Sequence, residues 1–108
     1  MLEPNDSSLP PDQQAVLEAV NALVRLNVAA RLISAAQLNV EQAQKARSMT
    51  EANYKYGAVT ALEVTDAETA LVQAETILAQ ALQQHADARA TVNYVMGRNP
   101  AGMNEVSP

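Results

Sequence analysis

The 108-residue sequence contains no cysteine, tryptophan or phenylalanine, and it has only three tyrosines. Without cysteine there can be neither a disulfide framework nor a thiolate metal site. With so few aromatic residues the chain cannot build a bulky globular core. The composition suits thin helix–helix packing instead, because small side chains let helix backbones approach each other closely.

Long apolar runs and positive charge are also scarce. No stretch approaches the roughly 20 apolar residues that a membrane-spanning helix needs, so we expect no direct membrane insertion by this segment. The opening residues, MLEPNDSSLPPDQQ, lack the basic region and apolar stretch of a signal peptide, and the chain as written is expected to be soluble. A net charge of −5 argues against nucleic acid as a partner.

What the sequence does have is helix-forming residues. There are 21 alanines, with frequent glutamine and leucine, and such side chains lose little freedom in a helix. Residues 1–11 hold three prolines and are predicted to be a disordered lead-in, after which Ser8 or Asp12 could cap a helix. Gly97 and Pro100 predict a helix stop and a flexible tail over 98–108. Between them we predict a helical hairpin over 12–97, with helices at 12–55 and 60–96 and a turn at 56–60.

Both predicted helices carry a heptad repeat, which indicates a left-handed coiled coil. We call these repeated positions the seam. In the first helix the seam is Ala22, Leu26, Ala29, Ile33, Ala36, Val40, Ala43, Arg47, Thr50 and Tyr54. In the second it is Val64, Ala67, Leu71, Ala74, Leu78, Ala81, His85, Ala88, Val92 and Val95. If the chain folds back at Gly57, facing residues have numbers that sum to about 117 or 118, so Val40 faces Leu78. The predicted fold class is therefore all-α, a long antiparallel helical hairpin.

Apolar residues also occur beside the seam. They are Leu23, Ala30 and Leu32 in the first helix, and Ala70, Ile77 and Leu82 in the second. Two helices cannot bury apolar faces this wide against each other, so each helix is expected to have a second neighbour. Self-association into a four-helix bundle and inclusion in a larger helical array are both consistent with this pattern.

The stretch NYKYGAVTALEVTDAETAL, residues 53–71, interrupts the helical sequence. Gly57 can adopt a positive φ at little cost and so ends the first helix. Thr60 and Glu63 form the T-x-x-E pattern of a capping box, which starts the second helix. Asp66 is favourably placed near the positive end of that helix dipole. These roles explain the interruption in purely structural terms.

The same stretch also resembles the hairpin-tip motif of the TolC-like outer-membrane efflux proteins. YKYGAVTALEVTDAE shows the aromatic residue, the turn glycine, a small or hydroxyl residue, and then the acid–Val–x–Asp–Ala run that opens the return helix. The resemblance extends over about residues 15–98, including AETILAQAL and the terminal VNYVMGR. The position of that ending favours the C-terminal one of the family's two repeats.

The resemblance implies a function in transport. Family members are homotrimeric channels that cross the outer membrane and the periplasm. Their helical hairpins converge at the periplasmic tips and close an iris, and a periplasmic adaptor docks there and links the channel to an inner-membrane pump. The chain is thus expected to be a periplasmic hairpin of such a channel, with the full-length protein in the periplasm and outer membrane. It is not expected to be an enzyme.

The resemblance also implies roles for single residues. Glu63 and Asp66 match the two acidic positions that line the constriction, Tyr54 matches an aromatic residue that helps to hold the closed state, and Gly57 matches the turn glycine. Val59 stands where some members carry a basic residue, so a closing ion pair through that position is not expected here.

Other interpretations compete with these. The chain could instead be a free-standing coiled-coil module for protein–protein interaction. His85 could be a metal ligand, but no partner residues cluster near it in the sequence, so a packed histidine is favoured and no metal or cofactor is expected. The acids of the second helix, among them Glu68, Glu75 and Asp87, read as a solvated face, whereas Glu63 and Asp66 also suit a pore lining.

Overall fold

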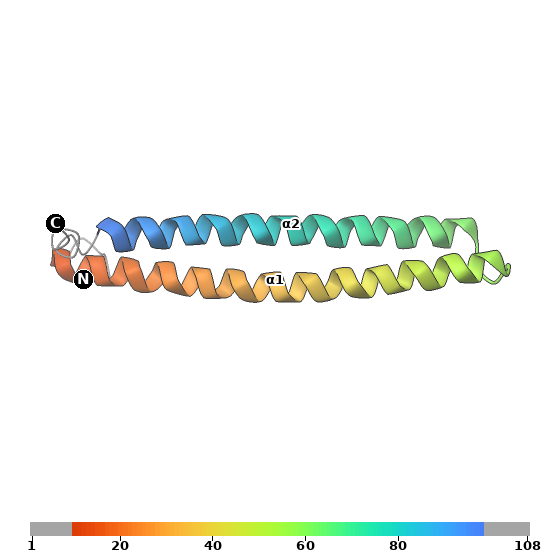
Figure 1. Cartoon of the computed structure of the whole chain (residues 1–108), viewed down its shortest axis with the longest axis horizontal. Coiled ribbons are helices and arrows are strands. Elements are labelled where there is room, and N and C mark those ends of the chain that lie inside the picture. Colours follow the sequence, from red (N-terminus) through yellow and green to blue (C-terminus); the bar gives the residue numbers. More distant parts are fainter. Residues whose placement is uncertain (1–9, 99–108) are drawn as a thin grey trace, which may run out of the picture.

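The computed structural model describes residues 10–98, which form two antiparallel α-helices lying side by side (Figure 1). Helix α1 spans Pro11–Lys55 and helix α2 spans Ala61–Arg98. The predicted all-α hairpin is confirmed. The lead-in predicted at 1–11 and the tail predicted at 98–108 lie outside the described residues, apart from residues 10, 11 and 98. We call the end at the turn the tip and the opposite end the base.

Helix α1 begins without a side-chain cap. Pro10 occupies the N-cap position with φ −61° and ψ 152°, and Pro11 is the first helical residue, where its missing N–H is not needed. Asp12, predicted as a cap, lies inside the first turn, where its carboxylate accepts a hydrogen bond from the backbone N–H of Gln13 at 2.9 Å. The expectation of a cap at Asp12 is wrong, because the prolines place the N-cap two residues earlier, at Pro10, and the other candidate, Ser8, lies outside the described residues.

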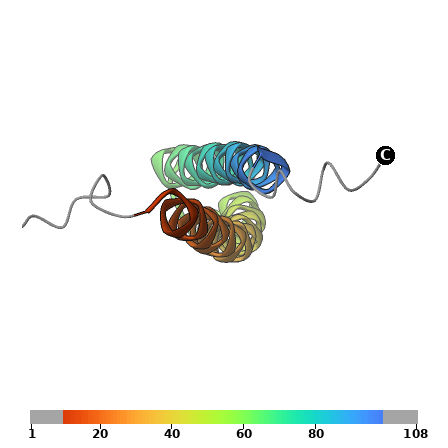
Figure 2. The ribbon, with the colours of Figure 1, turned by 90° about the vertical axis from the view of Figure 1, so that its left-hand side faces the viewer.

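The core of the hairpin is the predicted seam. Its most deeply buried members are Ala22, Ala29, Ala36, Leu71, Ala74, Ala81 and Val95. Larger seam residues such as Leu26, Ile33 and Leu78 are half-buried, because a single neighbouring helix cannot cover a long side chain on all sides. Viewed from the base, the two helices wind about each other in a left-handed sense, as a heptad repeat requires (Figure 2).

The register follows from which residues share a hollow between the helices. Ala29 and Ala88 line one hollow, and Ala36 and Ala81 line the next. Each pair sums to 117, as expected for a chain that folds back near Gly57. The seam therefore alternates small layers, such as Ala36 with Ala81, and large layers between them.

Besides Thr50 and His85, two further seam positions, Tyr54 and Arg47, depart from a buried apolar core. Tyr54 is 48% exposed, because α2 begins only at Ala61 and offers little beyond its first turn to cover the ring. Arg47 points its Nε into the seam, where this atom is buried without a hydrogen bond. The nearest carboxylate oxygen recorded for it is Oε2 of Glu51, one turn along α1, at 3.9 Å.

Candidate functional site: the hairpin tip

The backbone of α1 ends at the tip in a Schellman motif. Gly57 has φ +75°, the left-handed conformation that glycine adopts without steric cost. The N–H of Ala58 donates to the carbonyl oxygen of Asn53 at 2.9 Å, and the N–H of Gly57 donates to that of Tyr54 at 3.0 Å. These two bonds satisfy the last carbonyl groups of α1 and fix the direction in which the chain leaves the helix.

The start of α2 is fixed as firmly. The backbone N–H of Thr60 donates to Oε1 of Glu63 at 2.8 Å, and the N–H of Glu63 donates to Oγ1 of Thr60 at 3.2 Å. This is the reciprocal geometry of a capping box. Val59 and Val64, which flank the box at the staple positions, are both half-buried. The link between the helices is thus held from both ends.

Both acids predicted for the site lie on the first turns of α2. Glu63 is exposed, with one carboxylate oxygen engaged in the cap, and Asp66 follows three residues later, also exposed. No lysine or arginine occurs in α2 before Arg89, whereas Glu68 and Glu75 follow Asp66. The tip half of α2 therefore carries only negative charge, whereas the basic residues Lys45, Arg47 and Lys55 lie on the tip half of α1.

The tip also exposes apolar side chains. Besides Tyr54, Tyr56 is 86% exposed and Leu62 is 68% exposed. Sequence reasoning did not select Tyr56 or Leu62. The available signal was their place in the pattern, since Tyr56 directly precedes the turn glycine and Leu62 lies opposite the seam of α2. Large apolar side chains are exposed along the rest of the hairpin as well, so the tip is distinguished by the high exposure of Tyr56 and Leu62.

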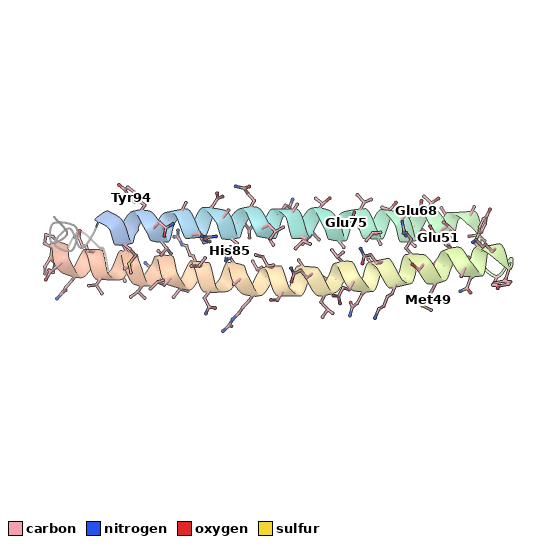
Figure 3. All side chains as sticks on the ribbon, in the orientation of Figure 1. Met49, Glu51, Glu68, Glu75, His85 and Tyr94 are labelled. Carbon is pink, nitrogen blue, oxygen red and sulfur yellow. The ribbon has the colours of Figure 1, made fainter. Side chains whose placement is uncertain are left out.

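The structure brings four of the predicted residues together in the turn and its two helix ends, namely Tyr54, Gly57, Thr60 and Glu63. Asp66 lies one turn further along α2, outside the hydrogen-bonded link. His85 is far from this site, in the middle of the hairpin, where it is half-buried (Figure 3).

Within residues 10–98, His, Asp and Glu side chains nowhere gather in a group of three that could hold a metal ion. Neither described helix contains an apolar stretch long enough to cross a lipid bilayer. The candidate functional site of the described residues is the tip.

The fold and the tip define the structural class of the protein, which is a long two-helix coiled-coil hairpin with acidic and aromatic residues at its turn. The chain belongs to the outer membrane efflux protein family, whose model matches residues 11–98. It is similar to nodulation protein T of Rhizobium leguminosarum bv. trifolii, with 31% identity over 93 residues. That alignment covers 86% of this chain but 19% of the relative, so the chain spans about a fifth of the relative's length. No solved structure matches the chain significantly.

Proposed function

We propose that this hairpin forms part of the periplasmic wall of an outer-membrane efflux channel, and that its tip contributes to the iris and to adaptor docking. The family assignment supports a role in transport. The observation that carries the finer proposal is the tip itself, where a turn fixed by hydrogen bonds presents Glu63 and Asp66 at the end of a long hairpin.

The iris role rests on the position and charge of the acids. A homotrimer, as the resemblance implies, would bring three copies of Glu63 and Asp66 around one axis. Rings of carboxylates favour cations and bind multivalent cations strongly. The Schellman motif and the capping box leave the link little freedom, so such a ring would have a defined radius in the closed state.

The docking role rests on the exposed apolar side chains of the tip. Tyr56 and Leu62 offer an aromatic and an aliphatic anchor of the kind that dominates binding energy at interfaces. The partner in this proposal is a periplasmic adaptor, which would link the tip to an inner-membrane pump.

The proposal is tested in the full-length protein reconstituted in a planar bilayer. The double variant Glu63→Gln with Asp66→Asn should lose most of the cation selectivity of the closed channel and most of its block by multivalent cations. Glu41→Gln, an exposed acid on α1 away from the tip, serves as the control and should change neither property. Unchanged selectivity and block in the double variant would contradict the iris role.

One observation favours the alternative of a free-standing interaction module. Val16, Val20 and Val24, spaced by four residues, are exposed along α1, and such a row could receive a partner helix. In that case the exposed valines would contribute more to partner binding than the residues of the tip. Alanine variants of Tyr56 and Leu62 would then leave adaptor crosslinking in the full-length protein unchanged.

A further inference from the structure

Each helix of the hairpin has an outer face, which is the side turned away from the other helix (Figure 2). The centre of this face follows from the seam. Arg31 is two residues from both Ala29 and Ile33, and two residues turn a helix by about 200°, so Arg31 lies opposite the seam. The same spacing, repeated every seven residues, gives the outer row of α1. Its members are all exposed, and they are Val24, Arg31, Leu38 and Lys45.

The two outer faces differ in the size of their side chains. On α1 the outer row is long or branched, and Leu38 in it is 53% exposed. On α2 most side chains of this face are small. Ala79 and Ala86 lie between members of the α2 outer row, which are again exposed, and which are Thr69, Thr76, Gln83 and Ala90. Such faces are complementary in shape, because large side chains can enter the spaces that small ones leave.

The two outer faces also differ in charge. Arg31 stands in the outer row of α1, whereas Asp87 lies one turn from Gln83 of the α2 outer row. A hydrogen bond of 3.0 Å from Nε2 of Gln83 to Oδ1 of Asp87 holds this carboxylate on the outer face. No acid lies three or four residues from Arg31, and no base lies three or four residues from Asp87. Neither charge is therefore neutralised by its own helix.

Size and charge match at one and the same level. Residues at equal height on α1 and α2 have numbers that sum to 117 or 118. Arg31 and Asp87 sum to 118, and Leu38 and Ala79 sum to 117. If a second copy stands level beside the first, with α1 of one against α2 of the next, Arg31 lies opposite Asp87 and Leu38 lies over Ala79. Leu38 then falls midway between two members of the α2 outer row, as a knob enters a hole in a coiled coil.

Contacts between like faces fit poorly. Two α1 outer faces would set large side chains against large ones, and level copies would place Arg31 beside Arg31. Two α2 outer faces would set acid against acid in either orientation, since α2 has no lysine or arginine between Asp66 and Asp87. A contact between unlike faces is heterologous, so it repeats from copy to copy and closes into a ring when the copies stay level. A ring agrees with the homotrimer that the resemblance implies.

We propose that the outer face of α1 binds the outer face of α2 of a second copy of this chain, with the two copies level and their bases at the same end. Copies then assemble side by side into a ring. This contact goes beyond the iris and the docking of an adaptor, and it uses no residue of the tip. Its failure would leave the channel proposal standing, because that proposal is tested on the acids of the tip in the full-length protein.

The first test uses chains with one cysteine each, since the native sequence has none. A mixture of Leu38→Cys and Ala79→Cys chains should form a disulfide-linked heterodimer on mild oxidation, and mass spectrometry identifies it because the two variants differ in mass. Each variant alone should give little homodimer, because like faces do not meet. Ala86→Cys is the control for the level, since it lies about 10 Å from position 79 along α2 and should link to Leu38→Cys much less. Homodimers as abundant as the heterodimer, or no linked product, would overturn the proposal.

The second test exchanges the charges and follows assembly of the 108-residue chain by sedimentation equilibrium, from micromolar to millimolar concentration. Arg31→Asp and Asp87→Arg should each raise the concentration of half-assembly at least about threefold, because each places like charges across the contact. The chain with both substitutions should return to within about twofold of the wild type, since every contact again joins opposite charges. Arg25→Asp, at an exposed arginine beside the hollow between the helices, is the matched control and should have little effect. A double variant no better than the single ones would contradict the pairing, and so would a monomeric wild-type chain.

The third test changes the shape of the contact. Ala79→Leu fills the space that Leu38 of the next copy enters, and it should raise the concentration of half-assembly at least about tenfold. Ala70→Leu is the matched control, because Ala70 is also exposed but lies beside the seam, on an edge that the contact does not use. Combining Leu38→Ala with Ala79→Leu moves the large side chain to the other face and should recover most of the assembly. Equal effects of Ala79→Leu and Ala70→Leu, or no recovery in the combined variant, would refute the proposed contact.

Discussion

Thr60 and Glu63 each bind the other's backbone, with the N–H of Thr60 donating to Glu63 Oε1 and the N–H of Glu63 donating to Thr60 Oγ1, at 2.8 and 3.2 Å. Glu63→Ala removes the first of these bonds and leaves the N–H of Thr60 to water. We expect the free energy of unfolding to fall by about 0.5–1 kcal/mol. Urea denaturation at a fixed chain concentration measures this. Glu68→Ala, at an exposed acid about two turns beyond the N-cap Thr60, should lower the free energy of unfolding clearly less.

The turn glycine gives a second prediction. A Cβ built on Gly57 meets no atom within 4 Å, so Gly57→Ala introduces no clash with neighbouring residues. Its cost comes from the backbone, since φ +75° is unfavourable for alanine, and we expect a loss of about 1 kcal/mol in stability. Gly97, which lies within α2, is the matched control, because Gly97→Ala should be neutral or slightly stabilising there. Equal changes in the free energy of unfolding at the two positions would show that the positive φ of residue 57 is not what makes alanine unfavourable there.

The third prediction concerns the pairing of the helices. Val40 and Leu78 are half-buried members of one large seam layer, with numbers that sum to 118. Cysteines introduced at these two positions should crosslink within one chain under dilute oxidising conditions. Electrophoresis without reducing agent distinguishes this product from a linked dimer. Crosslinks formed only between chains would show that the hairpin has opened into a swapped or continuous arrangement.

Arg47 provides a fourth prediction. Its guanidinium Nε is buried without a hydrogen bond, and Glu51 lies too far away, at 3.9 Å, to satisfy it. By the register of the hairpin Arg47 faces Leu71, so Arg47→Leu should pack in the seam and raise the free energy of unfolding by about 1 kcal/mol. Lys45→Leu, on the exposed side of α1, should stay within about 0.5 kcal/mol of the wild type. A destabilised Arg47→Leu would mean that the arginine has a partner that compensates for its burial.

The seam could be predicted from the sequence because heptad spacing is a local pattern. Two helices that supercoil about each other need this spacing along their whole contact. Ala36 and Ala81, or Val40 and Leu78, could be paired from their numbers once Gly57 was taken as the turn. The exposure of Tyr54 could not be predicted, because it depends on where α2 begins. The cap of α1 was not predicted correctly, since Pro10 and Pro11 outweigh the capping tendency of Asp12.

The hollows between the two helices could not be predicted from the sequence, for a different reason. The alternation of small and large seam residues was visible in the sequence. That the small layers lie toward one edge, and leave space there between Val28 and Gln84, follows only from the three-dimensional placement of both helices. At the tip, the capping residues could be predicted from the sequence. The exposure of Tyr56 and Leu62 became clear only in the structure.

The last prediction separates the two roles open to the acids of the tip. Asp66 lies one turn beyond the capping box, so its contribution to helix stability is limited to the dipole, and Asp66→Asn should change the free energy of unfolding of the hairpin by only a few tenths of a kcal/mol. In the proposed trimeric channel the same substitution would remove three charges from the constriction. There it should reduce cation selectivity and weaken block by multivalent cations measurably, even though folding is unaffected.

Glu63→Ala makes the comparison sharper, because it removes both the capping oxygen and the charge. If selectivity follows charge, Asp66→Asn and Glu63→Ala should reduce it by similar amounts while differing in their effect on stability. If selectivity instead follows the stability of the tip, only Glu63→Ala should change it. That second outcome would assign both acids to the start of α2 and would remove the iris from the proposed function.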